Sequence, residues 1–129
     1  ELTLEHPVNW DTSLISVIYL DWKKCDVIIQ FVEKMDNPLD LGKTDLNEVE
    51  ALITIPLYSE NKKLPTQDLL NTLTHEVGHS MGLGHYDSGV LNDKDSIMSP
   101  QFEPFESIIL HITPIDIMKM IEIYPEGFQ

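Results

Sequence analysis

Histidine and glutamate side chains are concentrated between residues 75 and 85, in the sequence H-E-V-G-H-S-M-G-L-G-H. The spacing predicts a helix over 69–81, which places His75 and His79 on one face, about one turn apart. Two imidazoles in this arrangement can bind one metal ion. Glu76 lies next to His75 at the edge of that face, where its carboxylate can hold and deprotonate a metal-bound water. Glu76 is therefore the candidate general base.

A third histidine, His85, follows the helical pair after two glycines. A helix continued to His85 would carry it about 15 Å past His75 and off the shared face. Gly82 can end the helix in the left-handed conformation, and Gly84 adds freedom just before the histidine. Three imidazoles can then converge on one ion and leave the fourth position of a tetrahedral zinc open for water, as in catalytic zinc sites. The alternative, histidines packed without any metal, suits a plain HExxH pattern better than this longer one.

The chain resembles the metzincin zinc peptidases, and among them most closely the matrixin-like catalytic domains. The residues that carry the resemblance are His75, Glu76, His79, Gly82 and His85, together with the later sequence D-S-I-M-S-P, which contains Met98. That sequence resembles the tight turn that places a methionine below the metal in this clan. An isolated methionine would more often fill a gap in the core.

The resemblance implies an α+β fold with a twisted, mostly parallel sheet packed on the active-site helix, and a small C-terminal subdomain that ends in a helix. Length and composition agree with a single domain, 1–129, because 129 residues that are 42% hydrophobic can form one compact core. Within it, an upper subdomain would span about 1–84 and a lower one about 85–129.

Composition restricts the partners and the compartment. The chain has eight lysines, no arginine and 22 acidic residues, for a formal charge of −14. This charge argues against nucleic acid as a partner, because phosphate binding requires clustered positive charge. Cys25 is the only cysteine, so an intrachain disulfide is excluded. The sequence contains no run of about 18 apolar residues, which a membrane-spanning helix would require. The resemblance implies an extracellular or cell-envelope location after removal of a leader, although the residues leave a cytoplasmic location open. Oligomeric state is not encoded in any recognisable pattern.

Four segments have the composition of strands or of an edge. Residues 14–20 and 25–32 are rich in β-branched and aromatic residues. Only residues 21–24 separate them, too few for a parallel crossover, so either they form a hairpin or a helix that the family places there is absent. Residues 41–45 resemble the edge strand along which substrate binds in the family, with an exposed loop as the alternative. Residues 50–58 alternate and should form a more central strand.

Two helices are expected in the remainder, after a polar loop over 59–65. Thr66 is a candidate N-cap of the active-site helix, and Thr113 with Pro114 should begin a C-terminal helix. The periodicity predicts that apolar side chains attach both helices to the core, namely Leu69, Leu70, Leu73 and Val77 in the first and Ile117, Met118, Ile121 and Tyr124 in the second.

Further site residues follow from the resemblance or from composition. Gly42 and Lys43 would lie on the substrate-binding edge, while Pro100 and Phe102 would form a wall of the specificity pocket, with plain core as the alternative for Phe102. The polar loop 86–96 contains four side chains that could bind calcium, although a solvated turn fits its spacing better.

The sequence thus predicts a zinc endopeptidase that cleaves extended proteins or peptides, with one zinc ion held by three histidines. The alternative is a catalytically impaired or latent metzincin-like module that binds zinc or protein. Retention of Glu76 argues against that alternative, because an inactive form need not keep the base.

Overall fold

The computed structural model of the chain describes residues 27–47, 50–85, 96–99 and 102–126. The chain divides into two compact units, residues 1–64 and 65–129. The strand predicted over 14–20, its connection to the next strand and most of the loop 86–96 lie outside the described residues. The division predicted near residue 84 stays a prediction. The fold is α+β, as predicted, with a small mixed sheet in the first unit and helices in the second.

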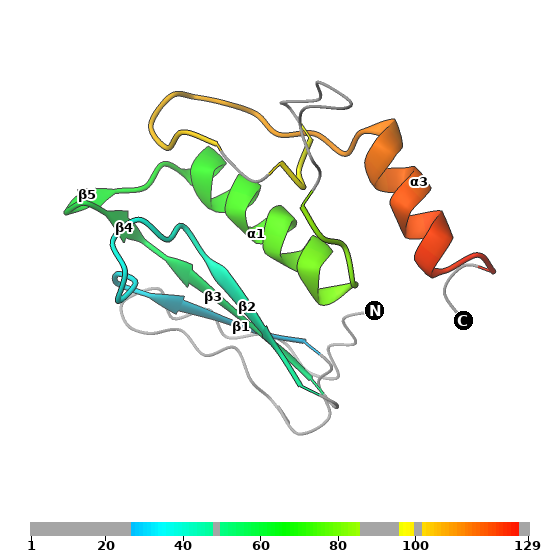
Figure 1. Cartoon of the computed structure of the whole chain (residues 1–129). Helices are drawn as coiled ribbons and strands as arrows, with labels where there is room; N and C mark the ends of the chain where they lie inside the picture. The colour runs from blue at the N-terminus through cyan, green and yellow to red at the C-terminus, as the bar shows by residue number, and fades with distance from the viewer. Residues whose placement is uncertain (1–26, 48–49, 86–95, 100–101, 127–129) are drawn as a thin grey trace, which may run out of the picture. The chain divides into compact units, whose positions relative to one another are not determined.

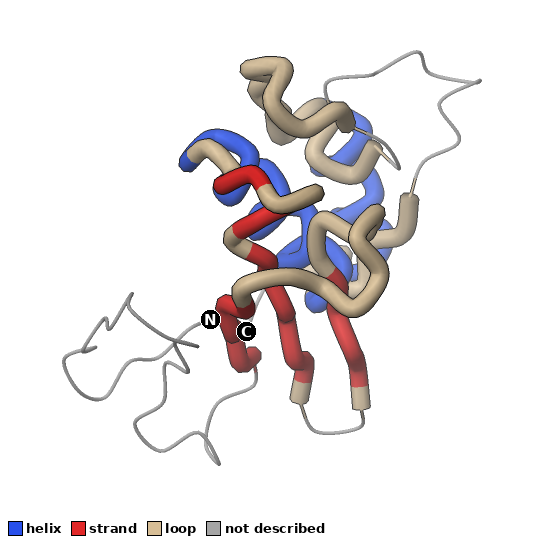
Figure 2. The backbone as a smooth tube through the Cα atoms, turned by 90° about the vertical axis from the view of Figure 1, so that its left-hand side faces the viewer, coloured by secondary structure: helices blue, strands red, loops and turns tan. Residues whose placement is uncertain are grey.

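The first unit contains a three-stranded sheet in the order β1-β3-β2, formed by β1 (Val27–Val32), β2 (Lys43–Leu46) and β3 (Ala51–Pro56). Figures 1 and 2 show these strands side by side. β1 runs parallel to β3 and β2 runs antiparallel to it. The strands predicted over 25–32 and 50–58 are confirmed, and β2 is the outer strand on its side of the described sheet, where an edge was predicted.

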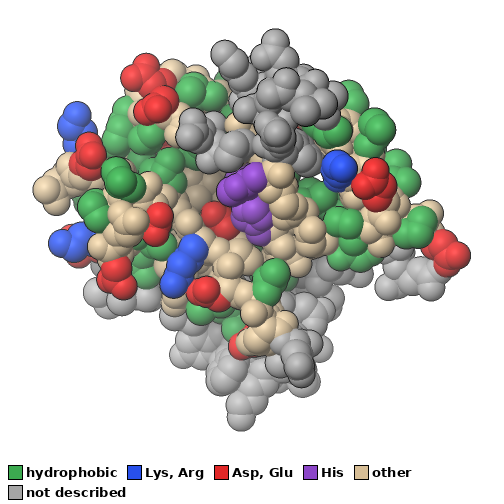
Figure 3. Space-filling view, viewed as in Figure 1, with side chains coloured by type: hydrophobic (Ala, Val, Ile, Leu, Met, Phe, Trp, Pro, Cys, Tyr) green, Lys and Arg blue, Asp and Glu red, His purple; other side chains and the backbone are tan. Residues whose placement is uncertain are grey.

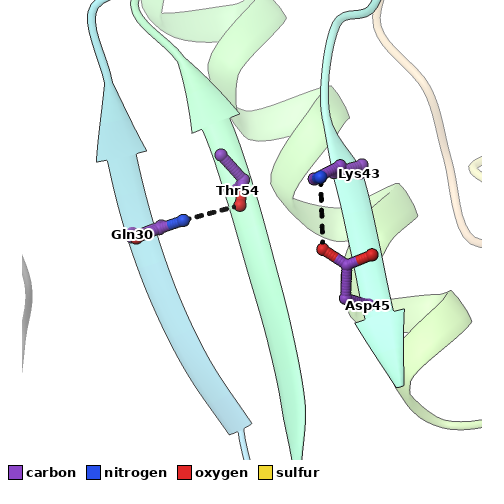
Figure 4. A network of polar contacts seen from close by, with 4 residues as sticks. All are labelled: Gln30, Lys43, Asp45 and Thr54. Atoms are coloured by element: carbon purple, nitrogen blue, oxygen red, sulfur yellow. Dashed lines mark hydrogen bonds and ion pairs between the residues drawn. The ribbon is translucent and has the colours of Figure 1, made fainter. Parts of the chain in front are cut away.

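β3 is central because its β-branched side chains suit a position with strands on both sides. Ile53 and Ile55, which project from the same face, are both 0% exposed. Thr54 on the other face accepts a hydrogen bond from Gln30 of β1, with 2.9 Å between Nε2 and Oγ1 (Figure 4). Buried apolar groups and cross-strand pairs therefore hold the described sheet of this unit together.

A small hairpin follows the sheet, where the sequence predicted only a polar loop. Strands β4 (Tyr58–Ser59) and β5 (Lys62–Lys63) pair antiparallel around a two-residue turn. Both turn residues, Glu60 and Asn61, have positive φ, at 50° and 65°. Such a turn matches the twist of the paired strands, and asparagine tolerates it well. Propensity alone missed the hairpin because its strands are short and polar.

The second unit contains α1 (Thr66–Ser80) and α3 (Pro114–Ile123). The N-cap of α1 is Pro65 and not Thr66: the proline ring fixes φ, here −61°, and a ψ of 154° completes the extended conformation that an N-cap adopts. In α3 the prediction is confirmed, because Thr113 is the N-cap and forms a capping box with Asp116. None of the described helices is long and apolar enough to cross a membrane.

The apolar faces predicted for the two helices are partly wrong. In α1, Leu70 is 50% exposed, and polar side chains occupy most of the buried positions. In α3, Ile117, Met118 and Ile121 are each more than half exposed. Helical periodicity identifies an apolar stripe, but it does not say which side of the helix the rest of the chain covers.

Buried apolar side chains of the second unit form one cluster, which consists of Leu83, Ile97, Met98 and Leu110. Three partly buried side chains pack against it, Phe102, Ile108 and Met120. The α3 contribution is thus Met120, which the periodicity did not single out. All four members of the cluster lie in irregular segments or turns, so this core has to be positioned by contacts outside regular secondary structure.

Candidate metal centre

Three histidine rings converge in the second unit. The Nε2 atom of His75 lies 3.0 Å from those of His79 and His85, and the latter two are 3.1 Å apart. Among the described His, Cys, Asp and Glu side chains, these three histidines form the group whose ligand atoms lie close enough together to hold one metal ion. Figure 3 shows histidine side chains gathered in a patch at the surface. The predicted ligands are therefore brought together, open to solvent on one side.

The helix end brings the third histidine back. Met81 ends α1, and Gly82 follows at φ +99° in the left-handed region. The Leu83 amide donates to the Gly78 carbonyl at 3.0 Å and the Gly82 amide donates to the His79 carbonyl at 3.0 Å. This pair of bonds is the Schellman motif, which reverses the chain within two residues of the helix. The turn expected from the glycine spacing is confirmed.

Hydrogen bonds to the backbone fix the tautomers of the two helical histidines. His75 Nδ1 lies 2.5 Å from the Ile97 carbonyl oxygen, and His79 Nδ1 lies 2.8 Å from that of Leu83. A carbonyl oxygen can only accept, so each Nδ1 carries a proton, and in the neutral ring Nε2 then presents a lone pair. Two lone pairs 3.0 Å apart repel each other because neither nitrogen has a proton to donate. A cation bound to both nitrogens would remove this repulsion.

The surroundings keep two of the rings in their neutral, metal-binding form. Burial lowers the pKa of His75, which exceeds the opposing effect of the Ile97 carbonyl, and the neighbouring His79 lowers it further. Burial also lowers the pKa of His85, with smaller contributions from the two other histidines. Neutral imidazole is the form that binds metals, so both rings are prepared to do so at neutral pH.

The donor set fits zinc. Nitrogen ligands at 2.0–2.1 Å around a tetrahedral ion lie about 3.3 Å from one another. The observed Nε2 separations of 3.0 to 3.1 Å are close to this value. Three neutral nitrogens, two of them oriented by backbone carbonyls, form the ligand set that catalytic zinc prefers.

Glu76 follows the first ligand in α1 and is 5% exposed. Its charge raises the pKa of His85, against the larger effect of burial. A carboxylate in this position can accept a proton from a water molecule at the cluster. Its role as general base stays a prediction.

A tight turn packs against α1, which carries His75 and His79 and is here named the ligand helix. The Ser99 amide donates to the Ser96 carbonyl at 3.0 Å, and Met98 within this turn is 0% exposed. A Cβ atom placed on Gly78 would be only 2.4 Å from the Met98 sulfur, so the thioether packs directly on the α1 backbone beside His79. Sequence reasoning missed Gly78, although a glycine inside a helix between two ligands is itself a signal of close packing.

The predicted substrate-binding residues are divided between the units. Gly42 and Lys43 lie in the first unit at the beginning of β2, whereas the histidines belong to the second. Pro100 lies outside the described residues, as do the candidate calcium ligands of the loop 86–95. Phe102 is half-buried and packs against the cluster around Met98, which agrees with a core role. The substrate and calcium assignments stay predictions.

The second unit thus brings together three histidines that could hold a metal ion, two on a helix and the third just after the glycine turn that ends it. The chain matches the family model of the matrixins over residues 42–125. It therefore belongs to the matrixin family, whose members are peptidases. No curated protein and no solved structure shows significant similarity to the chain.

Proposed function

We propose that the protein is a zinc-dependent endopeptidase that hydrolyses proteins or peptides bound in extended form. The observation that carries the proposal is the convergence of three Nε2 atoms within 3.0 to 3.1 Å, two of them on rings whose protons are committed to backbone carbonyls. Membership of a peptidase family supports the reaction class.

In this proposal His75, His79 and His85 hold the zinc ion. When bound, zinc polarises the scissile carbonyl and makes a water molecule more acidic. Glu76 takes a proton from that water as the water oxygen attacks the carbonyl carbon. It then delivers the proton to the nitrogen of the leaving amine as the C–N bond breaks. Burial of Glu76 limits competing water at the carboxylate. Met98, packed on Gly78, would support the ligand helix from below, as the turn methionine does in the metzincin clan.

The substrate side of the proposal rests on the family resemblance. Gly42 and Lys43, at the outer strand β2, would hold an extended chain by strand addition, which reads backbone more than side chains. Pro100 and Phe102 would border the pocket for an apolar residue after the scissile bond. An extracellular or cell-envelope site of action belongs to the same proposal.

The decisive test compares wild type with Glu76→Gln on a denatured protein mixture, with zinc content determined on the same samples. We expect about one zinc per chain in both proteins and cleavage only in the wild type. Chelation should abolish cleavage, and added zinc should restore it. Glu122→Gln is the matched control, because Glu122 is an exposed carboxylate of α3 paired with Lys119.

Two results would contradict the proposal in different ways. Zinc binding without any cleavage by the wild type would support the alternative, a latent or impaired module that binds zinc. Cleavage unchanged in Glu76→Gln would exclude Glu76 as the base, even if zinc were required. Fragment ends identified by mass spectrometry would test the apolar preference separately.

A further inference from the structure

Asp116 makes more contacts than a helix cap requires. It lies in the first turn of α3 and is 3% exposed. The Thr113 amide and hydroxyl donate to Oδ2 at 2.7 and 2.8 Å, which caps the helix locally. The Ser96 hydroxyl donates to the other oxygen, Oδ1, at 2.8 Å. This third contact reaches back 20 residues, to the turn beneath the ligand helix, and contributes nothing to capping.

Ser96 transmits this contact to the turn. It is 0% exposed, and its Oγ accepts the Met98 amide at 3.1 Å. A hydroxyl has one proton, and because Asp116 takes it, the lone pairs of Oγ are left for the Met98 amide. The carboxylate therefore fixes the direction of the hydroxyl, and the hydroxyl fixes the backbone of the turn.

Ile97, between these two residues, orients a predicted metal ligand. Its carbonyl accepts the Nδ1 proton of His75, and its amide donates to the His111 carbonyl at 2.9 Å. The backbone of Ile97 is thus held on one side by the Ser96–Met98 turn and on the other by the residue two positions before the α3 cap. Any loosening of the turn moves the carbonyl that sets the tautomer of His75.

We propose that Asp116 is a positioning residue of the metal centre, which acts through Ser96 to hold the Ile97 carbonyl against His75. The inference rests on the metal-binding part of the proposed function and is independent of peptidase activity. Partners that orient ligating histidines typically contribute 10- to 100-fold to metal affinity. Asp116 does not touch His75 itself but acts through Ser96 and the Ile97 carbonyl, so its effect should lie at the low end of that range.

Asp116→Asn is the main test. An asparagine oxygen that stays with Thr113 would point the amide nitrogen at Ser96, so that the hydroxyl would become an acceptor and its own proton would lose the carboxylate. We expect zinc affinity, measured by competition with a chromogenic chelator, to fall about tenfold. Ser96→Ala removes the same link from its other end and should produce a similar loss.

Two controls separate positioning from ordinary stabilisation. Thr113→Val removes the capping hydroxyl but leaves the Asp116–Ser96 contact, so it should lower thermal stability without changing zinc affinity more than about twofold. Asp68→Asn alters another buried carboxylate of this unit, whose hydrogen bond goes to the Phe105 amide, at 2.8 Å, and not to the described residues of the turn. It should behave like Thr113→Val.

The tautomer of His75 provides a readout that needs no metal. In the metal-free wild type, nitrogen NMR of the imidazoles should show His75 with its proton fixed on Nδ1. Asp116→Asn and Ser96→Ala should mix in the other tautomer, whereas both controls should not. A fixed tautomer and unchanged zinc affinity in the two test variants would overturn the proposal. A wild type that binds no zinc would instead refute the proposed function, and the NMR result would still decide the role of Asp116.

Discussion

The central strand of the first unit, β3, and the ligand helix of the second unit, α1, bury different kinds of side chain. The central strand of the first unit, β3, buries Ile53 and Ile55 completely. The ligand helix of the second unit, α1, buries mainly polar residues, which are Asp68, Asn71, Thr72 and Glu76. Hydrophobicity accounts for the buried isoleucines of β3, whereas hydrogen bonds to a distant segment account for the burial of Asp68 and Asn71 in α1.

The buried polar side chains of α1 hold an irregular segment in place. The Asn71 amide group donates to the Ile108 carbonyl at 2.8 Å and accepts the Leu110 amide at 3.2 Å. The Asp68 carboxylate accepts the amide of Phe105, whose φ of 69° is unfavourable for a bulky residue. A segment without regular secondary structure needs such partners for its backbone groups, because a buried group left unpaired is costly.

The largest expected effect belongs to the apolar strand β3. Ile53→Ala should lower the free energy of unfolding by about 2–5 kcal/mol, because it leaves a cavity at a fully buried position. Leu70→Ala is the matched control on α1, where the side chain is 50% exposed, and should change it by less than about 1 kcal/mol. Urea unfolding measures both, and equal losses would contradict the burial assigned to these residues.

Asn71→Leu tests the opposite rule in the second unit. Leucine forms helices more readily than asparagine, but the substitution leaves the Ile108 carbonyl and the Leu110 amide without their partner. The loss should be about 2 kcal/mol, as for buried backbone groups that lose hydrogen bonds.

Thr74→Val is its control, because it also replaces a polar side chain of α1 but removes only an exposed bond to the Leu70 carbonyl. Its effect in the same urea titration should be small. A variant Asn71→Leu that is as stable as wild type would show that apolar burial can replace the hydrogen bonds, and the contrast between the units would disappear.

This contrast explains which features could be predicted from the sequence. β1 was predictable from its β-branched and aromatic residues, and β3 was predictable because its sequence also alternates. The convergence of the histidines was predictable because it depends on a four-residue spacing and a glycine, all within residues 75–85. Local rules determine both features.

The remaining features depend on contacts between residues far apart in the chain. Asn71 is buried because residues 108 and 110 need its side chain, and Asp116 is buried partly because of Ser96, 20 positions earlier. No periodicity marks such pairs. The same reason accounts for Leu70, whose helical spacing suggested the core although it faces solvent.

Gly82→Ala sharpens the comparison within one turn. Gly82 has φ +99°, so a Cβ there is strained, and the substitution should cost about 1 kcal/mol. It should also weaken zinc binding, because the next residue, Leu83, orients His79 through its carbonyl. Gly84→Ala is the control, since a Cβ at Gly84 would have no atom within 4 Å. Equal effects of the two substitutions on thermal unfolding would refute the role assigned to the helix end.

The smallest effect on stability is expected for two exposed ion pairs, one in each unit. Lys43 pairs with Asp45 at 3.4 Å in β2, and Lys119 pairs with Glu122 at 3.6 Å in α3, with all four side chains about half exposed or more. Replacing either lysine by alanine should change the free energy of unfolding by less than about 0.5 kcal/mol, because water and salt screen such pairs.

Stability therefore cannot distinguish the two lysines, but function can. If β2 binds substrate as proposed, Lys43→Ala should raise KM for an extended peptide while Lys119→Ala leaves it unchanged. An unchanged KM in both variants would remove Lys43 from the substrate-binding edge without affecting the case for the metal centre.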